Sequence, residues 1–170
     1  RSVIQTAKHH VGRKVLVTID VKQFFPSISN ADVYFVWAAI LGCSPNIASI
    51  LTKLTTFERQ LPQGSPTSTA LANLFLLSCD TPIRGFCTAN GITYKTWVDD
   101  LIFSGKNPRS VISIAAKSLR RVGLQISRRK VKVMPSGGRQ VLMGIVVNRQ
   151  PGVTKEYRQA TRSGIHKLRT

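Results

Sequence analysis

The chain has 170 residues, of which 25 are Lys or Arg and seven are Asp or Glu, so its formal net charge is +18. Hydrophobic residues make up 42% of the sequence, which excludes a disordered chain and suffices for the core of one compact domain. No apolar run approaches the roughly 20 residues that a membrane-spanning helix needs, so we expect no contact with a membrane.

The positive charge predicts a polyanionic partner. Such an excess of one charge destabilises a compact chain unless a polyanion neutralises it, and nucleic acid is the partner that this composition favours. A basic, highly soluble protein, such as a ribosomal protein, is the alternative. Three cysteines form no C-x-x-C pair, so we expect them to be small buried residues in a reducing compartment.

The first half of the chain contains one predicted strand followed by helices. Residues 15–21 (VLVTIDV) are β-branched and apolar, as in a buried strand. Helices are expected over residues 30–41 and 45–55. A turn-rich stretch at 61–66 then precedes a long apolar helix over residues 67–79.

The second half begins with a predicted hairpin. Residues 92–98 and 101–104 are strand-like, and Asp99 and Asp100 lie between them, so we expect both acids at the hairpin tip. The further expected elements are a basic helix, two strands and a last basic helix, over residues 108–122, 130–134, 140–147 and 154–168.

This order of strand, helices, hairpin, helix and strand predicts an α+β fold. It is compatible with a ferredoxin-like split βαβ antiparallel sheet that carries helices on one face. In such a sheet the first strand can lie beside the hairpin, and Asp20 would then approach Asp99 and Asp100.

Three converging carboxylates indicate a metal site. Like-charged carboxylates raise one another's pKa and destabilise the site, so they favour a bound cation. Mg²⁺ takes carboxylate oxygens together with substrate phosphates and water. Two such ions can activate a primer 3′-hydroxyl and stabilise the leaving pyrophosphate of an in-line displacement.

Each acid also has a simpler explanation. Asp99 and Asp100 alone could form an ordinary polar turn, because Asp is common in turns. Asp20 lies within an apolar strand and would be a costly buried charge unless something binds it. A structural salt bridge with Lys14 or Lys22 is the alternative to a metal.

Four motifs in chain order resemble those of bacterial reverse transcriptases. They are residues 17–28 (VTIDVKQFFPSI), 61–68 (LPQGSPTS) followed by 71–73 (LAN), 97–100 (WVDD) and 139–148 (RQVLMGIVVN). The last motif and the FFPSI variant are similar to retron-type enzymes, with group II intron reverse transcriptases as close relatives. The resemblance extends over nearly the whole chain.

The resemblance implies a polymerase palm with part of the fingers. Residues 1–150 would form the palm with partial fingers, the fingers parts being about 1–14 and 30–60. Residues 151–170 would begin the connection to a thumb that this sequence lacks. A chain without the upstream fingers and the thumb is expected to have poor activity by itself.

The resemblance also implies the catalytic groups. Asp20, Asp99 and Asp100, with the Val21 carbonyl, would hold two Mg²⁺ ions, with Mn²⁺ as an alternative. Lys130 would protonate the leaving pyrophosphate or neutralise its charge. In so basic a chain, the simpler reading of Lys130 is a solvated surface charge.

The nucleotide-binding residues implied by the resemblance are Phe25, Gln63 and Gly64. Phe25 matches the steric gate that excludes a 2′-hydroxyl, although it could be a core residue. Gln63 would contact the incoming nucleotide, and Gly64 would let the backbone approach it. A plain turn at the start of a helix is the alternative for this pair.

The primer-binding residues implied are Trp97, Met143 and Gly144. Trp97 stands where the family usually has Tyr, which keeps an aromatic platform but loses the phenolic hydroxyl. Val98 departs from the Ala that is usual in retrons. Met143 and Gly144 would lie in the primer grip, and an ordinary strand is the alternative.

The function implied is a retron-type RNA-directed DNA polymerase of the bacterial cytoplasm, with a role in anti-phage defence among the options. Its partners would be an RNA template, a DNA or RNA primer and dNTPs, with a structured non-coding RNA as a further candidate. The alternatives are a group II intron or other defence-associated polymerase with the same palm, a metal-dependent nuclease, and a non-catalytic nucleic-acid-binding fragment.

Overall fold

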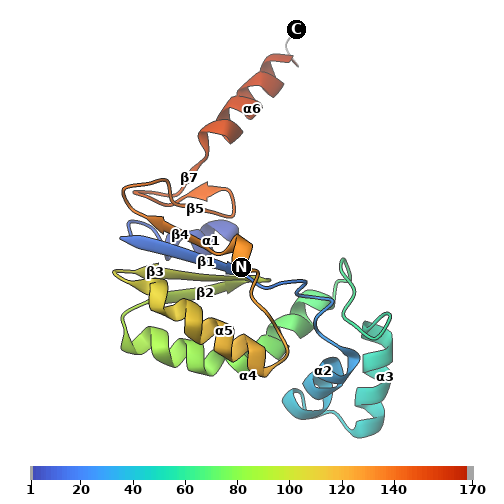
Figure 1. The fold of residues 1–170 in the computed structure, drawn as a ribbon. Coiled ribbons are helices and arrows are strands. Elements are labelled where there is room, and N and C mark those ends of the chain that lie inside the picture. Colours follow the sequence, from blue (N-terminus) through green and yellow to red (C-terminus); the bar gives the residue numbers. More distant parts are fainter. Residues whose placement is uncertain (1, 168–170) are drawn as a thin grey trace.

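A four-stranded antiparallel sheet lies at the centre of the computed structural model, which describes residues 2–167 (Figure 1). Its strand order is β2-β3-β1-β4. The strands are β1 (Val15–Asp20), β2 (Thr93–Trp97), β3 (Asp100–Gly105) and β4 (Lys132–Pro135). Because β1 lies between β3 and β4, the sheet has the ferredoxin-like split βαβ order, and the expected α+β fold class is confirmed.

The core lies on both faces of this sheet, because side chains alternate along a strand. On β1, Val17 and Ile19 are fully buried in the larger hydrophobic cluster, and Leu16 is fully buried in the smaller one. Helices α4 (Ser68–Ala89) and α5 (Val111–Arg121) pack against each other and cover the face of the larger cluster (Figure 1).

The other face is covered by α1 (Val3–Lys8) and by a small three-stranded sheet. The strands of that sheet are β5 (Val141–Leu142), β6 (Ile145–Val146) and β7 (Gly152–Val153). The sequence predicted one strand over residues 140–147, and this is wrong. Met143 and Gly144 form a two-residue hairpin turn with φ angles of +47° and +79°, the left-handed conformation that reverses a hairpin.

A helical lobe stands beside the sheet (Figure 1). It consists of α2 (Asn30–Phe35), the π-helix η1 (Val36–Ile40) and α3 (Pro45–Thr55). The Ser29 hydroxyl accepts a hydrogen bond from the Asp32 amide, and the Asp32 carboxylate accepts one from the Ser29 amide. This capping box begins the first helix where the sequence predicts it.

Helix α4 is ten residues longer at its C-terminal end than the expected segment 67–79. The apolar stripe continues past Cys79 to Ile83 and Cys87, which are all buried in the larger cluster. Burial of this stripe extends the helix despite Pro82, which lies inside it and removes one backbone hydrogen bond.

Short elements complete the chain. They are the 3₁₀ turns η2 (Pro108–Ser110) and η3 (Arg128–Lys130) and the exposed helix α6 (Lys155–Lys167), which projects away from the sheet (Figure 1). The predicted last helix extended to residue 168, which lies outside the described residues. Within residues 2–167, no helix is long and apolar enough to cross a membrane.

The β2–β3 hairpin reverses in two residues, Val98 and Asp99, because Trp97 pairs with Asp100. Asp100 is therefore the first residue of β3, and only Asp99 of the two acids lies in the turn, which corrects the expected position. Val98 has a φ of +53°, in the left-handed region that costs a non-glycine residue about 1–2 kcal/mol. Two-residue hairpin turns usually have Gly at such a position.

We expect Val98→Gly to be more stable than Val98→Ala by about 1 kcal/mol in urea unfolding, because glycine removes the left-handed strain. The comparison with Ala largely cancels the packing that both variants lose. Thr96→Gly and Thr96→Ala, in the regular part of β2, form the matched control pair, and there Gly should be less stable by about 0.5–1 kcal/mol. A stability difference between Gly and Ala of the same sign at both positions would contradict left-handed strain at Val98.

Candidate active site

The site begins at one end of the pairing between β1 and β3. Asp20, the last residue of β1, and Asp100, the first residue of β3, are Cα partners in this antiparallel pair. The Val21 amide donates a hydrogen bond of 3.0 Å to the carbonyl oxygen of Asp99. The structure therefore brings the ends of the segments that carry all three predicted acids together.

Lys130 lies against these acids. Its Nζ donates a hydrogen bond of 2.9 Å to Oδ1 of Asp20, across 110 residues of sequence. The alternative salt bridge with Lys14 or Lys22 does not form, so the partner of Asp20 is a lysine that the sequence marked as a candidate proton donor and not as an ion-pair partner.

Backbone hydrogen bonds hold the segment that carries Lys130. The Ser127 amide donates to the Asp20 carbonyl oxygen at 2.8 Å, and the Lys22 amide donates to the Gln125 carbonyl oxygen at 2.7 Å. These bonds flank a β-bridge between Val21 and Ile126. They fix η3 beside the end of β1 and place Lys130 within reach of Asp20.

The acids influence one another electrostatically. Partial burial, followed by the negative charges of Asp99 and Asp20, raises the pKa of Asp100 from 3.8 to about 6, and the cations Lys130 and Lys132 oppose this rise. The hydrogen bond to Asp20 raises the pKa of Lys130. The two lysines therefore compensate only part of the negative charge.

A hollow of about 400 Å³, here called the catalytic hollow, lies in front of these groups. Its lining includes Asp20, Asp100 and Lys130 together with Met143 and Gly144 of the β5–β6 turn. Predicted catalytic and primer-binding residues that are far apart in sequence thus meet at one surface. Lys132 also lines it and was not among the predicted site residues, although its two-residue spacing from Lys130 in the predicted strand 130–134 was a signal that both could face the same way.

The acids do not form a ready metal-ligand set. In the described part of the chain, no three His, Cys, Asp or Glu side chains are arranged to hold a metal ion. The donor chemistry nevertheless fits a hard divalent cation, because carboxylate oxygens are the ligands it prefers. The ammonium group of Lys130 is already in contact with Asp20, so a metal would take over an existing cation contact.

Phe25, the predicted steric gate, packs against the larger hydrophobic cluster. Phe24 is 4% exposed and is buried in the larger cluster, so it packs inward as expected. Phe25 is partly buried against the same cluster, with its ring centroid 5.3 Å from that of Phe24. Phe25 does not line the catalytic hollow.

The exposed pair Gln63 and Gly64 lies in the loop before α4. Gly64 has a φ of +88°, a conformation that favours glycine. The Leu61 amide donates to the Ile28 carbonyl oxygen at 3.0 Å, which ties this loop to the segment that follows Phe25. Neither Gln63 nor Gly64 lines the catalytic hollow.

Trp97 is the Cα partner of Asp100 in the β2–β3 pair, so its ring lies on the same face of the sheet as that carboxylate. It packs against the smaller hydrophobic cluster, as Met143 does. Trp97 and Val98 line a separate hollow of about 490 Å³ beside α4. The structure therefore brings two predicted primer-binding residues to the catalytic hollow and places the third next to it.

A family profile described as reverse transcriptase (RNA-dependent DNA polymerase) matches residues 1–155. The retron Mx65 reverse transcriptase of Myxococcus xanthus is 34% identical, over 98% of this chain and 44% of that protein. The retron Ec86 reverse transcriptase of Escherichia coli is 29% identical, over 99% of this chain and 53% of that protein. The chain spans about half the length of these curated relatives.

A structure of apo telomerase from Candida tropicalis, truncated from the C-terminal domain, has a similar fold. The TM-score is 0.63 at 10% sequence identity, and the match covers 89% of this chain and 38% of that one. At this identity the likeness concerns the fold alone.

The raised pKa of Asp100 predicts how stability depends on pH. Its folded pKa of about 6 lies above its ordinary value of 3.8, so loss of the proton opposes folding and this group lowers stability as pH rises from about 4 to about 6. Asp100→Asn removes that effect. We expect the variant to be more stable than the wild type by on the order of 1 kcal/mol at pH 7, after allowance for solvent screening, and equally stable at about pH 4.

The measurement is urea unfolding at both pH values, with and without Mg²⁺. Mg²⁺ should stabilise the wild type more than Asp100→Asn, because the metal offsets the repulsion that the variant has lost. Glu58→Gln, at an exposed acid after α3, removes the same charge from this basic chain and is the matched control. An equal change in the free energy of unfolding of both variants at pH 7 would show that net charge, and not the site, is responsible.

Proposed function

Because the chain belongs to the reverse transcriptase (RNA-dependent DNA polymerase) family, we propose that it is the core of a retron-type RNA-directed DNA polymerase. The observation that carries the proposal is the pairing of Asp20 with Asp100, with Asp99 beside them and Lys130 in contact. The similarity to the two retron enzymes supports the retron type.

Reverse transcriptases use divalent metal ions, and for this chain we propose two Mg²⁺ ions, with Mn²⁺ able to replace them. Asp20, Asp99 and Asp100 and the carbonyl oxygen of Val21 would hold them. When bound, such ions activate the primer 3′-hydroxyl and stabilise the charge on the leaving pyrophosphate.

Lys130 has two roles in this proposal. Without a metal, its ammonium group neutralises part of the charge of Asp20 through their hydrogen bond. With that carboxylate holding a divalent cation, the Lys130 ammonium group would be free to donate a proton to the pyrophosphate or to stabilise its charge. Its raised pKa keeps it protonated until then.

The nucleotide is proposed to lie against Phe25, Gln63 and Gly64. The ring of Phe25 is braced by the larger cluster, so it can exclude a 2′-hydroxyl by contact with the sugar. Gly64 has a positive φ, Gln63 is exposed, and the hydrogen bond from the Leu61 amide to the Ile28 carbonyl oxygen ties their loop to the segment that follows Phe25.

The primer end is proposed to lie against Met143 and Gly144, which share the catalytic hollow with Asp20 and Asp100. Trp97 precedes the hairpin turn, is the Cα partner of Asp100 and would support the primer from beside that residue.

Reverse transcriptases act on nucleic acid. For this chain we propose an RNA template, a DNA or RNA primer and dNTPs, and a structured non-coding RNA as a partner in a retron with an anti-phage role. The domain division proposed is a palm with partial fingers over residues 1–150, with fingers at about 1–14 and 30–60, and the start of a thumb connection over 151–170. A bacterial cytoplasmic location fits the free thiols of the described cysteines and the bacterial sources of the relatives.

The first test concerns the metal ligands, in the full-length protein. Asp99→Ala and the isosteric Asp99→Asn should reduce nucleotide incorporation on a primed RNA template by at least about 100-fold, the scale of losing one charge-stabilising group. Binding of the primed template should remain within about threefold, because phosphate contacts carry most of that affinity. Glu58→Gln should leave both unchanged. Normal incorporation by Asp99→Asn would point to a non-catalytic nucleic-acid-binding protein.

The second test concerns the choice of sugar. Phe25→Ala should raise the incorporation of ribonucleotides relative to deoxynucleotides by about 10- to 100-fold, since contact with one hydroxyl supports discrimination of this size. The assay is single-nucleotide extension with dNTP and rNTP in parallel. Phe24→Leu alters the neighbouring buried ring and is the control, and its selectivity should match the wild type. Unchanged selectivity in Phe25→Ala would remove the gate from the proposal.

A further inference from the structure

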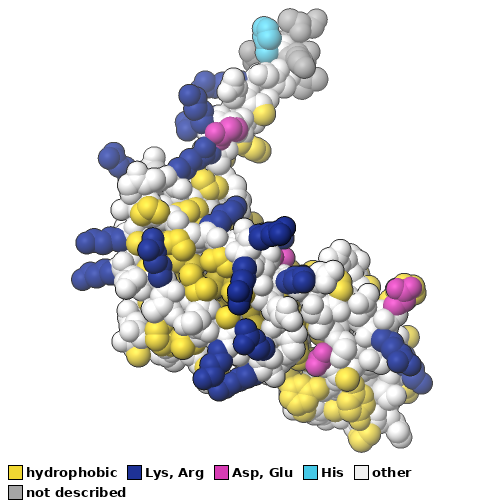
Figure 2. All heavy atoms as spheres, viewed as in Figure 1, with side chains coloured by type: hydrophobic (Ala, Val, Ile, Leu, Met, Phe, Trp, Pro, Cys, Tyr) yellow, Lys and Arg dark blue, Asp and Glu magenta, His cyan; other side chains and the backbone are white. Residues whose placement is uncertain are grey.

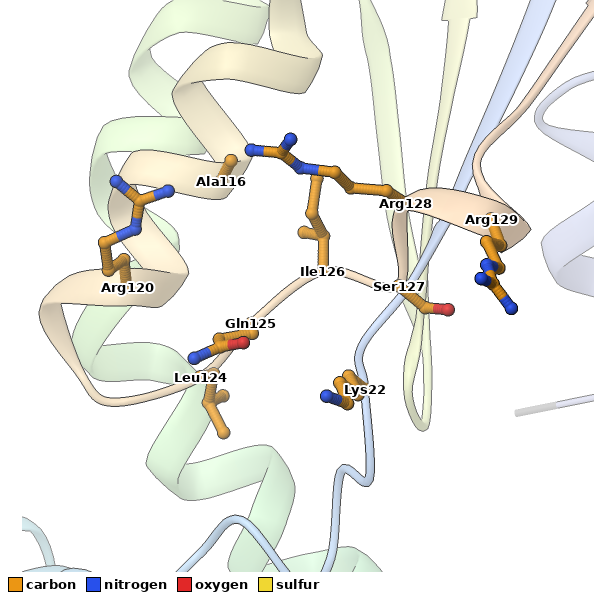
Figure 3. A pocket seen from close by; sticks show the side chains of 9 residues that line it. All are labelled: Lys22, Ala116, Arg120, Leu124, Gln125, Ile126, Ser127, Arg128 and Arg129. Carbon is orange, nitrogen blue, oxygen red and sulfur yellow. The ribbon is translucent and has the colours of Figure 1, made fainter.

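A second, basic hollow lies behind the segment that carries Lys130. It has a volume of about 610 Å³ and is lined by α5 and by the chain that follows it (Figure 3). Its cations are Lys22, Arg120, Arg128 and Arg129. This basic hollow shares no lining residue with the catalytic hollow.

The short turn η3 separates the two hollows. Lys130, at its end, turns to Asp20, whereas Arg128, at its start, extends toward α5, which carries Arg120 (Figure 3). Lys22 reaches the same hollow from the segment after β1. Cations from three separate parts of the chain therefore meet around one space.

None of these four cations is neutralised by the protein. The ion pairs in the described residues join Arg84 to Asp80, Lys130 to Asp20 and Arg139 to Glu156. Arg120 lies in the last turn of α5, where the helix dipole favours a cation. That explanation does not extend to Lys22, Arg128 and Arg129. Clustered like charges oppose folding unless an anion binds, so the hollow is suited to a polyanion.

Further exposed cations flank this hollow outside its lining. Lys117 and Arg121 of α5 are four residues apart, so they lie on one face of the helix, and Arg109 lies in η2, just before α5. Lys and Arg side chains gather on this side of the molecule (Figure 2). Lys117 and Arg121 are about 6 Å apart along the helix at 1.5 Å per residue, which matches about two phosphates at 3.4 Å per phosphate along one strand.

The cations outside the hollow decide between two sources of phosphate. A single nucleotide carries one short polyphosphate chain, which could occupy the hollow but would leave Arg109, Lys117 and Arg121 without an anion. A nucleic-acid strand supplies phosphates both in the hollow and outside it. The α5 surface, defined as Lys22, Arg109, Lys117, Arg120, Arg121, Arg128 and Arg129, therefore fits a strand better than a nucleotide.

We propose that the α5 surface binds the sugar-phosphate backbone of a nucleic-acid segment that runs outside the catalytic hollow. Contacts to phosphate position a nucleic acid without reading its sequence, so this binding is independent of sequence and falls steeply with salt. It requires no catalysis, so its failure and the failure of the polymerase proposal are distinguishable.

The test uses the purified 170-residue chain and a labelled short RNA hairpin, with affinity measured by fluorescence anisotropy between about 50 and 200 mM salt. The triple variant Arg120→Gln, Arg128→Gln, Arg129→Gln should bind the hairpin at least about tenfold more weakly. The magnitude of the slope of log affinity against log salt should fall by about 2 to 3, as expected when three phosphate contacts disappear.

The matched control is Lys8→Gln, Lys53→Gln, Arg59→Gln, which removes the same charge from exposed positions elsewhere and should weaken binding less than about threefold. Circular dichroism and thermal unfolding check both variants, and loss of unpaired surface cations should not unfold either. If the triple variant of Arg120, Arg128 and Arg129 does unfold, the single variants Arg128→Gln and Arg129→Gln replace it. Each should change the slope of log affinity against log salt by about 1.

Two results would overturn the proposal. If both triple variants weakened RNA binding equally, the RNA affinity would depend only on the net charge of the protein. The second result would come from calorimetry with sodium tripolyphosphate. The wild type would bind tripolyphosphate, whereas the triple variant of Arg120, Arg128 and Arg129 would lose this binding and keep its RNA affinity. The hollow would then serve a nucleotide polyphosphate and not a strand.

Discussion

The antiparallel pairing of β1 with β3 is the constraint on which the site depends. It holds Asp20 and Asp100 as direct partners, although their charges repel. The pairing persists because neighbouring side chains such as Ile19 and Leu101 are almost completely buried, and each contributes about 1.5–3 kcal/mol through removal from water. Repulsion between two partly solvated carboxylates is smaller than this sum, so the core sets their positions.

The chain then balances part of the charge that this pairing creates. The bridge between Val21 and Ile126 fixes η3, and η3 presents Lys130 to Asp20. The compensation is incomplete, because the pKa of Asp100 remains raised. A site in this state gains stability when a more highly charged cation binds, which is the property that a metal-dependent polymerase requires.

Part of the backbone strain lies around the same site. Gln23, Val98 and Met143 are three of the five non-glycine residues with positive φ among the described residues, and the other two, Glu58 and Arg59, lie in the loop after α3. The first three lie after β1, in the hairpin turn before Asp99, and in the turn that lines the catalytic hollow. Strained conformations of this kind persist where the surrounding structure imposes them and gather at functional sites. None could be read from the sequence, because each residue type ordinarily avoids that conformation.

The sequence by itself determined the fold class and the family resemblance, and it marked three acids as candidates. Alternation of apolar residues and the order of motifs are local properties, so residues 15–21 already marked β1 and its terminal Asp20. Tertiary structure decided what depends on distant contacts, such as the Lys130–Asp20 hydrogen bond across 110 residues and the start of β3 at Asp100. It also formed the basic hollow, because the charges of Lys22 and Arg128 acquire a common function only when folding brings them to one surface.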